Sequence, residues 1–426
     1  MTRKWSEMEP GELYTERLER LEAVIKGKEP DRVPVHAETS LFHAHYAGYT
    51  AKDITLDYLK NKDAALKTAR DFNFDTLACI TGVAGFYSFL ALMKDAPQIA
   101  PSAALMQAPF HKILNDVYTR WPGIEIEDDA APQFIGREVM SSDEYAKLAE
   151  DPYDFINRVL LPRICRSLND PGSSEYNAAL TSFGAEINKF NMVMGEMSAE
   201  LSGKYEVPLI PTGWSSAPLD FLSDFLRDMK NLSLDLYRCP EKVKVAVDAL
   251  TPVMVESAKV TGTFPEEVRK QAGTDIVQCM FPLHLNEYLN PKLYDEYFWP
   301  SLLEVLEEVI KMGQTPFVVF EGRQDAHLES LLDLPKGKVI GLFDKTDPRK
   351  VRDVLGDHLV LVSGPPNSLL IAGTPQKVET YVKSLLDDCK EGGMIVTPGV
   401  DGGISGSAKP ENVKALVDAV IKYGGY

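Results

Sequence analysis

The feature that most constrains the fold is an alternation of short apolar runs with helix-sized segments, which continues from about residue 205 to the end of the chain. The runs are rich in β-branched residues and lack a regular apolar–polar alternation, as is typical of strands buried on both faces of a parallel sheet. Together with two earlier runs, they predict strands at 32–38, 75–80, 206–211, 274–280, 316–322, 337–344, 358–364 and 392–399.

The segments between these strands share a helix-start signal. A Pro-x-x-Val pattern stands at 240–243, 265–268, 348–351, 375–378 and 410–413, and proline suits the first helical turn because the amide there has no intrahelical partner. Alternating strands and helices predict either a doubly wound sheet or a (β/α)8 barrel. Neither nucleotide-binding glycine motif accompanies the strands, so we expect an α/β chain folded as a (β/α)8 TIM barrel.

The first part of the chain follows this rhythm less closely. A helix over 11–27 precedes the first strand and predicts an N-terminal extension of the barrel. Residues 97–175 are rich in proline and lack strand–helix order, so we interpret them as an insertion or cap within a single domain spanning 1–426. Apolar residues at three- and four-residue steps within 183–201 predict a helix that packs against the core. The aromatic residues of the insertion suit a planar ligand or a small core equally well, and they are Phe110, Tyr118, Trp121 and Phe134.

The charge balance limits the partners that the protein can bind. Forty-five Lys and Arg stand against 63 Asp and Glu, a net charge of −18, which repels nucleic acid and anionic membranes. No apolar run reaches the roughly 18–20 residues of a membrane span, and the polar start does not resemble a signal peptide. The five cysteines are scattered and form no C-x-x-C pair. We expect a cytoplasmic protein, either a monomer or a homodimer.

In a TIM barrel, the residues that carry out the chemistry follow the carboxyl ends of the strands. Glu321 closes an apolar run at 317–320, where a carboxylate is costly unless it meets a metal, a cation or donated hydrogen bonds. A salt bridge to Arg323 or a nearby lysine would also satisfy it. The polar or large side chains at the predicted strand ends are His36, Glu38, Trp214, Ser215, Met280, His284, Glu321, Arg323, Asp344 and Asp401.

The last predicted strand runs into a glycine-rich loop, GGMIVTPGVDGG at 392–403. The simplest interpretation is a tight turn after a strand. Gly399, Gly402 and Gly403 would also leave space for a large flat group to approach the backbone.

Four stretches together resemble the uroporphyrinogen decarboxylase superfamily. They begin RLEAVIKGKEPDRVPV, GWSSAPLDFL, LNPKLYDEYF and LIAGTPQKVE, and they span 20–35, 213–250, 289–322 and 370–423. The resemblance covers most of the chain outside 97–175, and it implies the same (β/α)8 barrel. The superfamily also includes cobalamin-linked methyltransferases that act on methanol, methylamines and aryl methyl ethers.

Two departures narrow the activity that this resemblance implies. Uroporphyrinogen decarboxylases carry an arginine-rich segment near the start that holds the porphyrinogen carboxylates, whereas no arginine follows Arg32 in the corresponding stretch. Members that methylate coenzyme M hold zinc with an H-x-C pair and a late cysteine. Those positions fall on Val319-Phe320-Glu321 and on Val400, beside Asp401. Decarboxylation of a porphyrinogen and methylation of coenzyme M are therefore both disfavoured.

The resemblance then implies an enzyme similar to the aryl-ether O-demethylases of anaerobic one-carbon metabolism. Such a methyltransferase removes the methyl group of a methoxylated, aromatic substrate and gives it to Co(I) of a separate corrinoid protein. The chain has no D-x-H-x-x-G segment of its own for cobalamin. A decarboxylase or lyase acting on a small carboxylic acid and an inactive binding barrel are the alternatives.

The expected reaction assigns roles to the strand-end residues, because charge builds on the ether oxygen and a proton donor or Lewis acid must stabilise it. We expect Glu321, His284 and Asp344 to be catalytic. Zinc held by His284, Glu321 and Asp401 is one form of this site, and a metal-free general acid is the other. The resemblance implies that Gly399, Gly402 and Gly403 face the corrinoid and that substrate contacts come from His36, Glu38, Trp214, Ser215, Met280 and Arg323.

Overall fold

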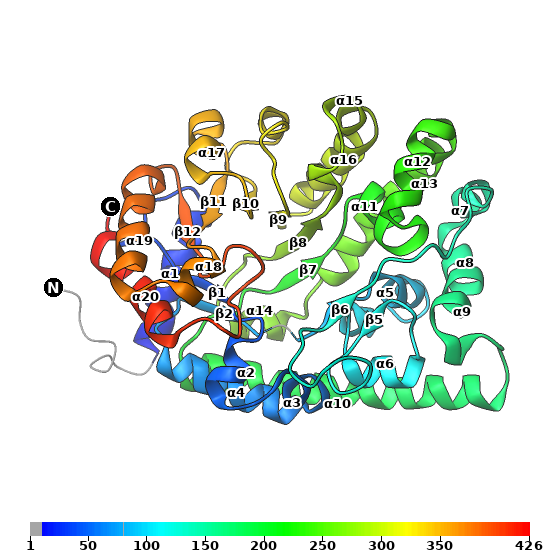
Figure 1. Cartoon of the computed structure of the whole chain (residues 1–426), viewed down its shortest axis with the longest axis horizontal. Helices are drawn as coiled ribbons and strands as arrows, with labels where there is room; N and C mark the ends of the chain where they lie inside the picture. Colours follow the sequence, from blue (N-terminus) through cyan, green and yellow to red (C-terminus); the bar gives the residue numbers. More distant parts are fainter. Residues whose placement is uncertain (1–10, 80) are drawn as a thin grey trace.

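A computed structural model describes residues 11–79 and 81–426 and confirms the (β/α)8 TIM barrel (Figure 1). Strands β7 to β12 form one parallel sheet in chain order, β1 pairs with β2, and a parallel bridge between Val35 and Val396 joins the two parts. Within the described ranges, β2 and β7 share no backbone ladder. The barrel strands are β1 His36–Glu38, β2 Thr76–Ala78, β7 Thr212–Trp214, β8 Gln278–Leu283, β9 Thr315–Phe320, β10 Ile340–Phe343, β11 Val360–Ser363 and β12 Met394–Val396.

Helices surround the strands, and the predicted proline starts are confirmed. Four of these helices begin on the proline of a Pro-x-x-Val segment, and α14 (Glu266–Ala272) begins directly after Pro265. The helices from β7 onward are α11 Pro218–Leu222, α12 Met229–Arg238, α13 Pro240–Thr261, α14, α15 Pro291–Leu293, α16 Trp299–Lys311, α17 Pro348–Leu355, α18 Asn367–Ala372, α19 Pro375–Cys389 and α20 Pro410–Tyr423.

The predicted N-terminal extension is α1 (Glu12–Ile25), which closes the amino-terminal end of the barrel. Its residues Val24 and Ile25 pack with Phe317, Ile340 and other strand side chains in a small core of their own inside the barrel. A much larger core fills the space between the strands and the surrounding helices. Helix α1 therefore fills the barrel interior from its amino-terminal end.

Two of the predicted strands were misplaced. The predicted strand at 206–211 is wrong, because β7 begins only at Thr212 and the residues before it include Pro208 and Pro211, which have no amide to donate to a ladder. The strand predicted at 274–280 begins four residues later and continues to Leu283. The remaining predicted strands overlap the observed ones, and Ile80, the last residue of one of them, lies outside the described residues.

The first half of the chain supplies the other helices and two small antiparallel strand pairs. The pairs are β3 Val83–Ala84 with β4 Leu105–Met106 and β5 Thr119–Arg120 with β6 Gln133–Phe134. The helices are α2 Phe42–Ala47, α3 Ala51–Leu56, α4 Tyr58–Asp71, α5 Phe86–Met93, α6 Ala108–Leu114, α7 Tyr145–Glu150, α8 Pro152–Phe155, α9 Leu161–Ile164 and α10 Ser174–Lys204.

The aromatic residues predicted in the insertion belong to the core. Phe110, Tyr118 and Trp121 are buried, and Phe134 packs against Phe225 at 5.4 Å between ring centroids. The long helix α10 buries Phe183, Ile187 and Leu201, as its periodicity predicted. The exact limits of the insertion, 97–175, stay a prediction. No helix in the described ranges is both long and apolar enough to cross a membrane.

Candidate active site

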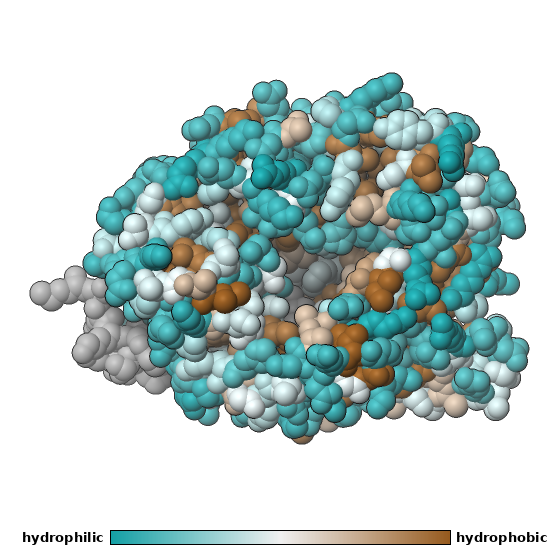
Figure 2. Space-filling view, in the orientation of Figure 1, coloured by the Kyte–Doolittle hydropathy of each residue, from teal (hydrophilic) through white to brown (hydrophobic). Residues whose placement is uncertain are grey.

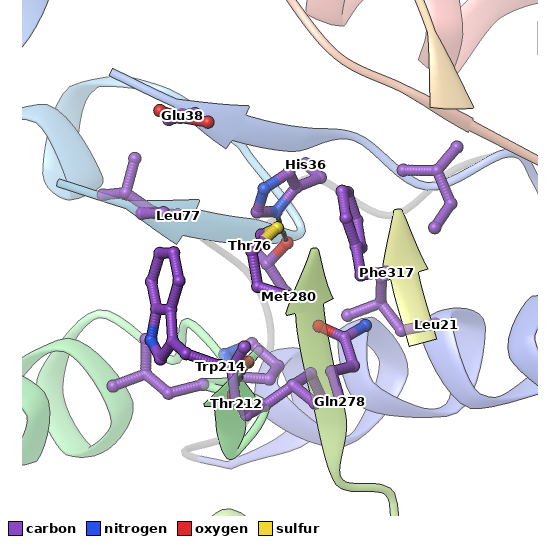
Figure 3. Close-up of a pocket in the computed structure, with 15 residues that line it drawn as sticks. Leu21, His36, Glu38, Thr76, Leu77, Thr212, Trp214, Gln278, Met280 and Phe317 are labelled. Atoms are coloured by element: carbon purple, nitrogen blue, oxygen red, sulfur yellow. Dashed lines mark hydrogen bonds between the residues drawn. The ribbon is translucent and has the colours of Figure 1, made fainter. Parts of the chain in front are cut away.

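A cavity of about 240 Å³ lies inside the barrel, between β1 and β2 on one side and β7, β8 and β9 on the other (Figure 3). The molecular surface is hollowed near the middle of the face in Figure 2, where Figure 1 places the ends of these strands. For comparison, a cavity of roughly 150 Å³ holds benzene. The cavity therefore has room for one aromatic ring with small substituents. Its walls are mainly apolar, and its lining residues are Leu21, His36, Glu38, Thr76, Leu77, Ala78, Pro208, Leu209, Ile210, Thr212, Trp214, Gln278, Met280, Phe317 and Ile395.

Four predicted substrate contacts line this cavity: His36, Glu38, Trp214 and Met280. Strand register places them together, because His36 pairs with Thr76, and Trp214 pairs with Met280, which in turn pairs with Phe317. Alternate residues of a strand point to the same face, so His36 and Glu38 of β1 both face inward. The other two predicted contacts, Ser215 and Arg323, are not in the lining.

Ser215 and Arg323, which were also predicted as substrate contacts, lie outside the lining of this cavity. Ser215 is fully buried behind β7, and its hydroxyl donates to the carbonyl of Met254 on α13 at 2.8 Å. Arg323 lies exposed on the loop after β9 and makes no ion pair with Glu321 within the described structure. Neither side chain is placed to touch a ligand in the cavity.

The two ionisable groups of the cavity are both shifted toward their neutral forms. Burial lowers the pKa of His36 to about 4, and its Nδ1 lies 2.7 Å from the hydroxyl of Thr76. Burial, with the nearby charge of Glu321 added, raises the pKa of Glu38. In the part of the chain that the structure describes, the Glu38 carboxyl has no hydrogen-bond partner. Glu38 thus presents a carboxyl group with a raised pKa and no hydrogen-bond partner among the described residues to the cavity.

A second cluster of polar side chains lies at the carboxyl end of the barrel, with His284 at its centre. Its Nδ1 lies 2.6 Å from Asp224 and its Nε2 lies 3.1 Å from Glu321. Burial alone would lower the pKa of His284, but the two carboxylates outweigh that effect and raise it to about 12. The two contacts therefore favour the protonated imidazole, which bridges Asp224 and Glu321.

Sequence reasoning missed Asp224 and its neighbour Asp220. Asp220 lies on α11 and Asp224 on the π-helix η5 (Ser223–Arg227) that follows it. Asp220 is buried and accepts hydrogen bonds from the backbone amides of His284 and Leu285, and burial together with the charge of Asp224 raises its pKa. Two acids four residues apart in an otherwise apolar helix were the available signal, since such spacing places both on one face.

Asp344 and Asp401 lie apart from the cavity. Asp344 Oδ2 accepts from the amide of Gly322 at 3.2 Å, its Oδ1 is buried without a partner in the described structure, and burial raises its pKa, with the charges of Asp401 and Glu321 adding to the effect. Asp401 accepts from both the backbone and the side chain of Asn367. Its carboxylate helps to fix the glycine-rich loop.

The three predicted corrinoid-facing glycines differ in their surroundings. Gly399 and Gly403 are buried, and a Cβ on Gly399 would lie 2.4 Å from the carbonyl oxygen of Gly403. Gly402 is exposed, with open space where its Cβ would stand. Close packing within the loop therefore requires Gly399, and a Cβ on Gly403 would lie 2.9 Å from the carbonyl oxygen of Glu38 on β1. Of the three glycines, Gly402 alone is exposed.

The residues predicted to hold zinc do not fit that role. Glu321 and His284 are in contact, but Asp401 bonds to Asn367 instead. Across residues 11–79 and 81–426, no three His, Cys, Asp or Glu side chains form a group that could hold a metal ion. In the described structure, the three predicted zinc ligands are therefore divided between the His284–Glu321 contact and the Asn367–Asp401 contact.

Comparison with known proteins places the chain in a family. Residues 190–423 match the uroporphyrinogen decarboxylase (URO-D) family. The uroporphyrinogen decarboxylase of Schizosaccharomyces pombe is 24% identical over 236 residues, which is 51% of this chain and 60% of the yeast enzyme. A methyltransferase from Methanosarcina mazei has a similar fold, with a TM-score of 0.53 and 18% identity over 95% of this chain and 98% of its own. The match extends over more than half of the sequence, and the chain belongs to the uroporphyrinogen decarboxylase family.

Proposed function

We propose that this protein is a methyltransferase that removes the methyl group of a methoxylated aromatic substrate and transfers it to Co(I) of a separate corrinoid protein. The observation that carries the proposal is the Glu38 carboxyl, which faces an apolar, ring-sized cavity without a hydrogen-bond partner among the described residues. The similarity in fold to the methyltransferase of Methanosarcina mazei agrees with it.

The cavity is suited to this substrate and poorly suited to a porphyrinogen. Trp214 and Phe317 offer ring faces for stacking, and about 240 Å³ accommodates one ring. A substrate with several carboxylates would need cations, and none of the described residues that line the cavity is lysine or arginine. A decarboxylase would have to bind at least one carboxylate in the same place.

The arrangement can supply the proton that the reaction requires. When the methyl carbon bonds to Co(I) through the electron pair of the cobalt, the carbon–oxygen bond breaks and its electrons stay on the oxygen. An acid is most effective when its pKa lies near the working pH, and the raised pKa of Glu38 brings it closer to that range. Glu38 donates its proton to the oxygen, and the substrate leaves as a neutral phenol.

His284, Asp224 and Glu321 act on Glu38 as positioning residues. His284 bridges Asp224 and Glu321, and the charge of Glu321 disfavours ionisation of Glu38. The catalytic role predicted for Glu321 and His284 thus becomes an electrostatic one, exerted through Glu38. Asp344 lies outside the cavity lining.

The proposal is tested by supplying the purified protein with methoxyaromatic compounds and chemically reduced cob(I)alamin. We expect formation of the demethylated phenol, with the visible spectrum of methylcobalamin appearing in step. We expect Glu38→Gln to lower kcat by about 10²–10⁴-fold while the substrate still binds. Activity should be lost above the pKa of Glu38, where the carboxyl has no proton to donate. Because the charge of Glu321 raises this pKa, the loss of activity should begin at lower pH in Glu321→Gln.

Two results would contradict the proposal. Release of CO2 from a small carboxylic acid without any corrinoid would identify a decarboxylase. Absence of methyl transfer across a broad panel of bound methoxyaromatics would identify an inactive binding barrel.

A further inference from the structure

The charge inside the cavity carries an inference about which methoxyaromatic compounds it accepts. We propose that the substrate is an uncharged ring and that the cavity rejects rings bearing a carboxylate, with Glu38 as the residue that determines this choice. The inference rests on the proposed function for the identity of the ligand and goes beyond it in fixing the ligand's charge.

The lining offers nothing that could neutralise an anion. None of its fifteen residues is lysine or arginine, and burial holds His36 in its neutral form by lowering its pKa to about 4. The His284 cation lies outside this lining and is already shared between two carboxylates. An isolated carboxylate in an apolar cavity costs several kcal/mol or shifts its own pKa.

Glu38 adds a specific repulsion to this general cost. Its carboxyl faces the cavity and already lies within the influence of the Glu321 charge. Where Glu38 is ionised, a ligand carboxylate would be a second negative group in the same poorly solvated space, where like charges repel more strongly than in water. A neutral hydroxyl or ether oxygen, in contrast, can accept a hydrogen bond from Glu38 when its carboxyl carries a proton, and it brings no charge when the carboxyl is ionised.

Neutral polar substituents also find partners on the cavity walls. The Gln278 side-chain amide and the Trp214 indole N–H line the cavity, and neither has a hydrogen-bond partner in the described chain. Both can donate hydrogen bonds, and Gln278 can also accept one. A phenol or benzyl alcohol would satisfy these groups without bringing a charge into the barrel.

The test compares two ligands of nearly the same shape, 4-methoxybenzyl alcohol and 4-methoxybenzoate, by titration calorimetry at pH 7.5 without corrinoid. We expect the wild-type protein to bind the alcohol at least 10-fold more tightly. In Glu38→Gln, which keeps the size of the side chain, this preference should shrink at least 5-fold. Gln278→Lys adds a cation to the lining and should shrink it as well.

Glu287→Gln is the matched control, because Glu287 lies outside the cavity lining, 3.9 Å from Lys345, so the variant removes one negative charge elsewhere. Its preference should equal that of the wild-type protein. Equal or tighter binding of the benzoate by the wild type, failure of both ligands to bind, or an unchanged preference in both Glu38→Gln and Gln278→Lys would overturn the inference. Circular dichroism establishes that each variant is folded.

The binding measurement separates this inference from the proposed function. Preference for the alcohol without any methyl transfer would support the charge selection and contradict the methyltransferase. Efficient demethylation of 4-methoxybenzoate would support the methyltransferase and contradict the charge selection.

Discussion

At the scale of single residues, the site depends on how differently its carboxyl groups are surrounded. Asp224 and Glu321 share the His284 cation, Asp220 is held by two backbone amides, and Glu38 is left without a hydrogen-bond partner among the described residues. Groups of the same chemical type take different protonation states when burial and neighbouring charges differ. The raised pKa of Glu38 follows first from its burial and then from the nearby charge of Glu321.

The contact between Asp224 and His284 is open to direct measurement. Replacing Asp224 by asparagine removes the shorter of the two carboxylate contacts of the imidazole, so the pKa of His284 should fall by about 1–3 units. Nitrogen-detected NMR of the imidazole follows this titration. Asp325→Asn serves as a control, since Asp325 pairs with Lys350, and an equal fall in both variants would show that Asp224 has no specific role.

His43 gives the stability of the protein a predictable acid dependence. It is buried between Thr39 and Asn61, and burial lowers its pKa to about 4, against about 6.5 in the unfolded chain. Between pH 6.5 and 4 the unfolded state binds the proton and the native state does not, so stability falls as the pH decreases through this window. The difference of about 2.5 units corresponds to about 3 kcal/mol. Urea unfolding of wild type and His43→Gln at pH 7.5 and 4.5 measures how much free energy of unfolding each protein loses on acidification. The loss should be smaller in the variant, and equal losses would contradict the role of His43.

At the scale of secondary-structure elements, the loops after the strands are fixed by contacts between distant segments. Asn367, the first residue of α18, donates to Asp401 and to the carbonyl of Gly403 and accepts from the amide of Ser405. The amide of Ile404 in turn donates to the carbonyl of Glu38 at the end of β1. The loop after β12 therefore helps to position the proposed acid.

The glycines of this loop provide a matched pair of variants. Gly399 and Gly402 both have positive φ, at +69° and +106°, so alanine strains the backbone at either position. Only at Gly399 would the new Cβ also collide with the backbone, at the Gly403 carbonyl. Gly399→Ala should therefore lower the thermal unfolding midpoint and the activity more than Gly402→Ala does. A larger loss in Gly402→Ala would point to a surface role for Gly402, such as the predicted contact with the corrinoid.

At the scale of the whole molecule, the alternation of strands and helices was enough to predict the barrel, and the barrel was enough to bring His36, Glu38, Trp214 and Met280 into one cavity. What the sequence could not provide was side-chain direction. Trp214 and Ser215 are adjacent, so they point to opposite faces of the strand, and only Trp214 points inward. Asp224 was not predicted, because the direction of its side chain depends on how α11 and η5 cross the end of the barrel.

The contact of α1 with the amino-terminal end of the barrel leads to a prediction about the stability of the whole fold. Asp75, just before β2, is fully buried and pairs with Arg20 of α1 and with Arg32 before β1, and it also accepts from the amide of Val35. The two guanidinium groups hold the pKa of Asp75 low although burial alone would raise it. One carboxylate thus joins the helix that closes the barrel to its first two strands.

Removing this charge should destabilise the native state far more than removing an exposed one. Asp75→Asn leaves two buried guanidinium groups without their shared counter-charge, which typically costs about 3–5 kcal/mol. Asp31→Asn is the natural control, because Asp31 pairs with the same Arg20 but its side chain is 62% exposed, and exposed pairs contribute about 1 kcal/mol or less. Urea unfolding followed by tryptophan fluorescence measures both free energies. Equal effects of the two substitutions would mean that α1 is held by its apolar contacts with the barrel floor, through Val24 and Ile25, and that the buried ion pairs add no net stability to its docking.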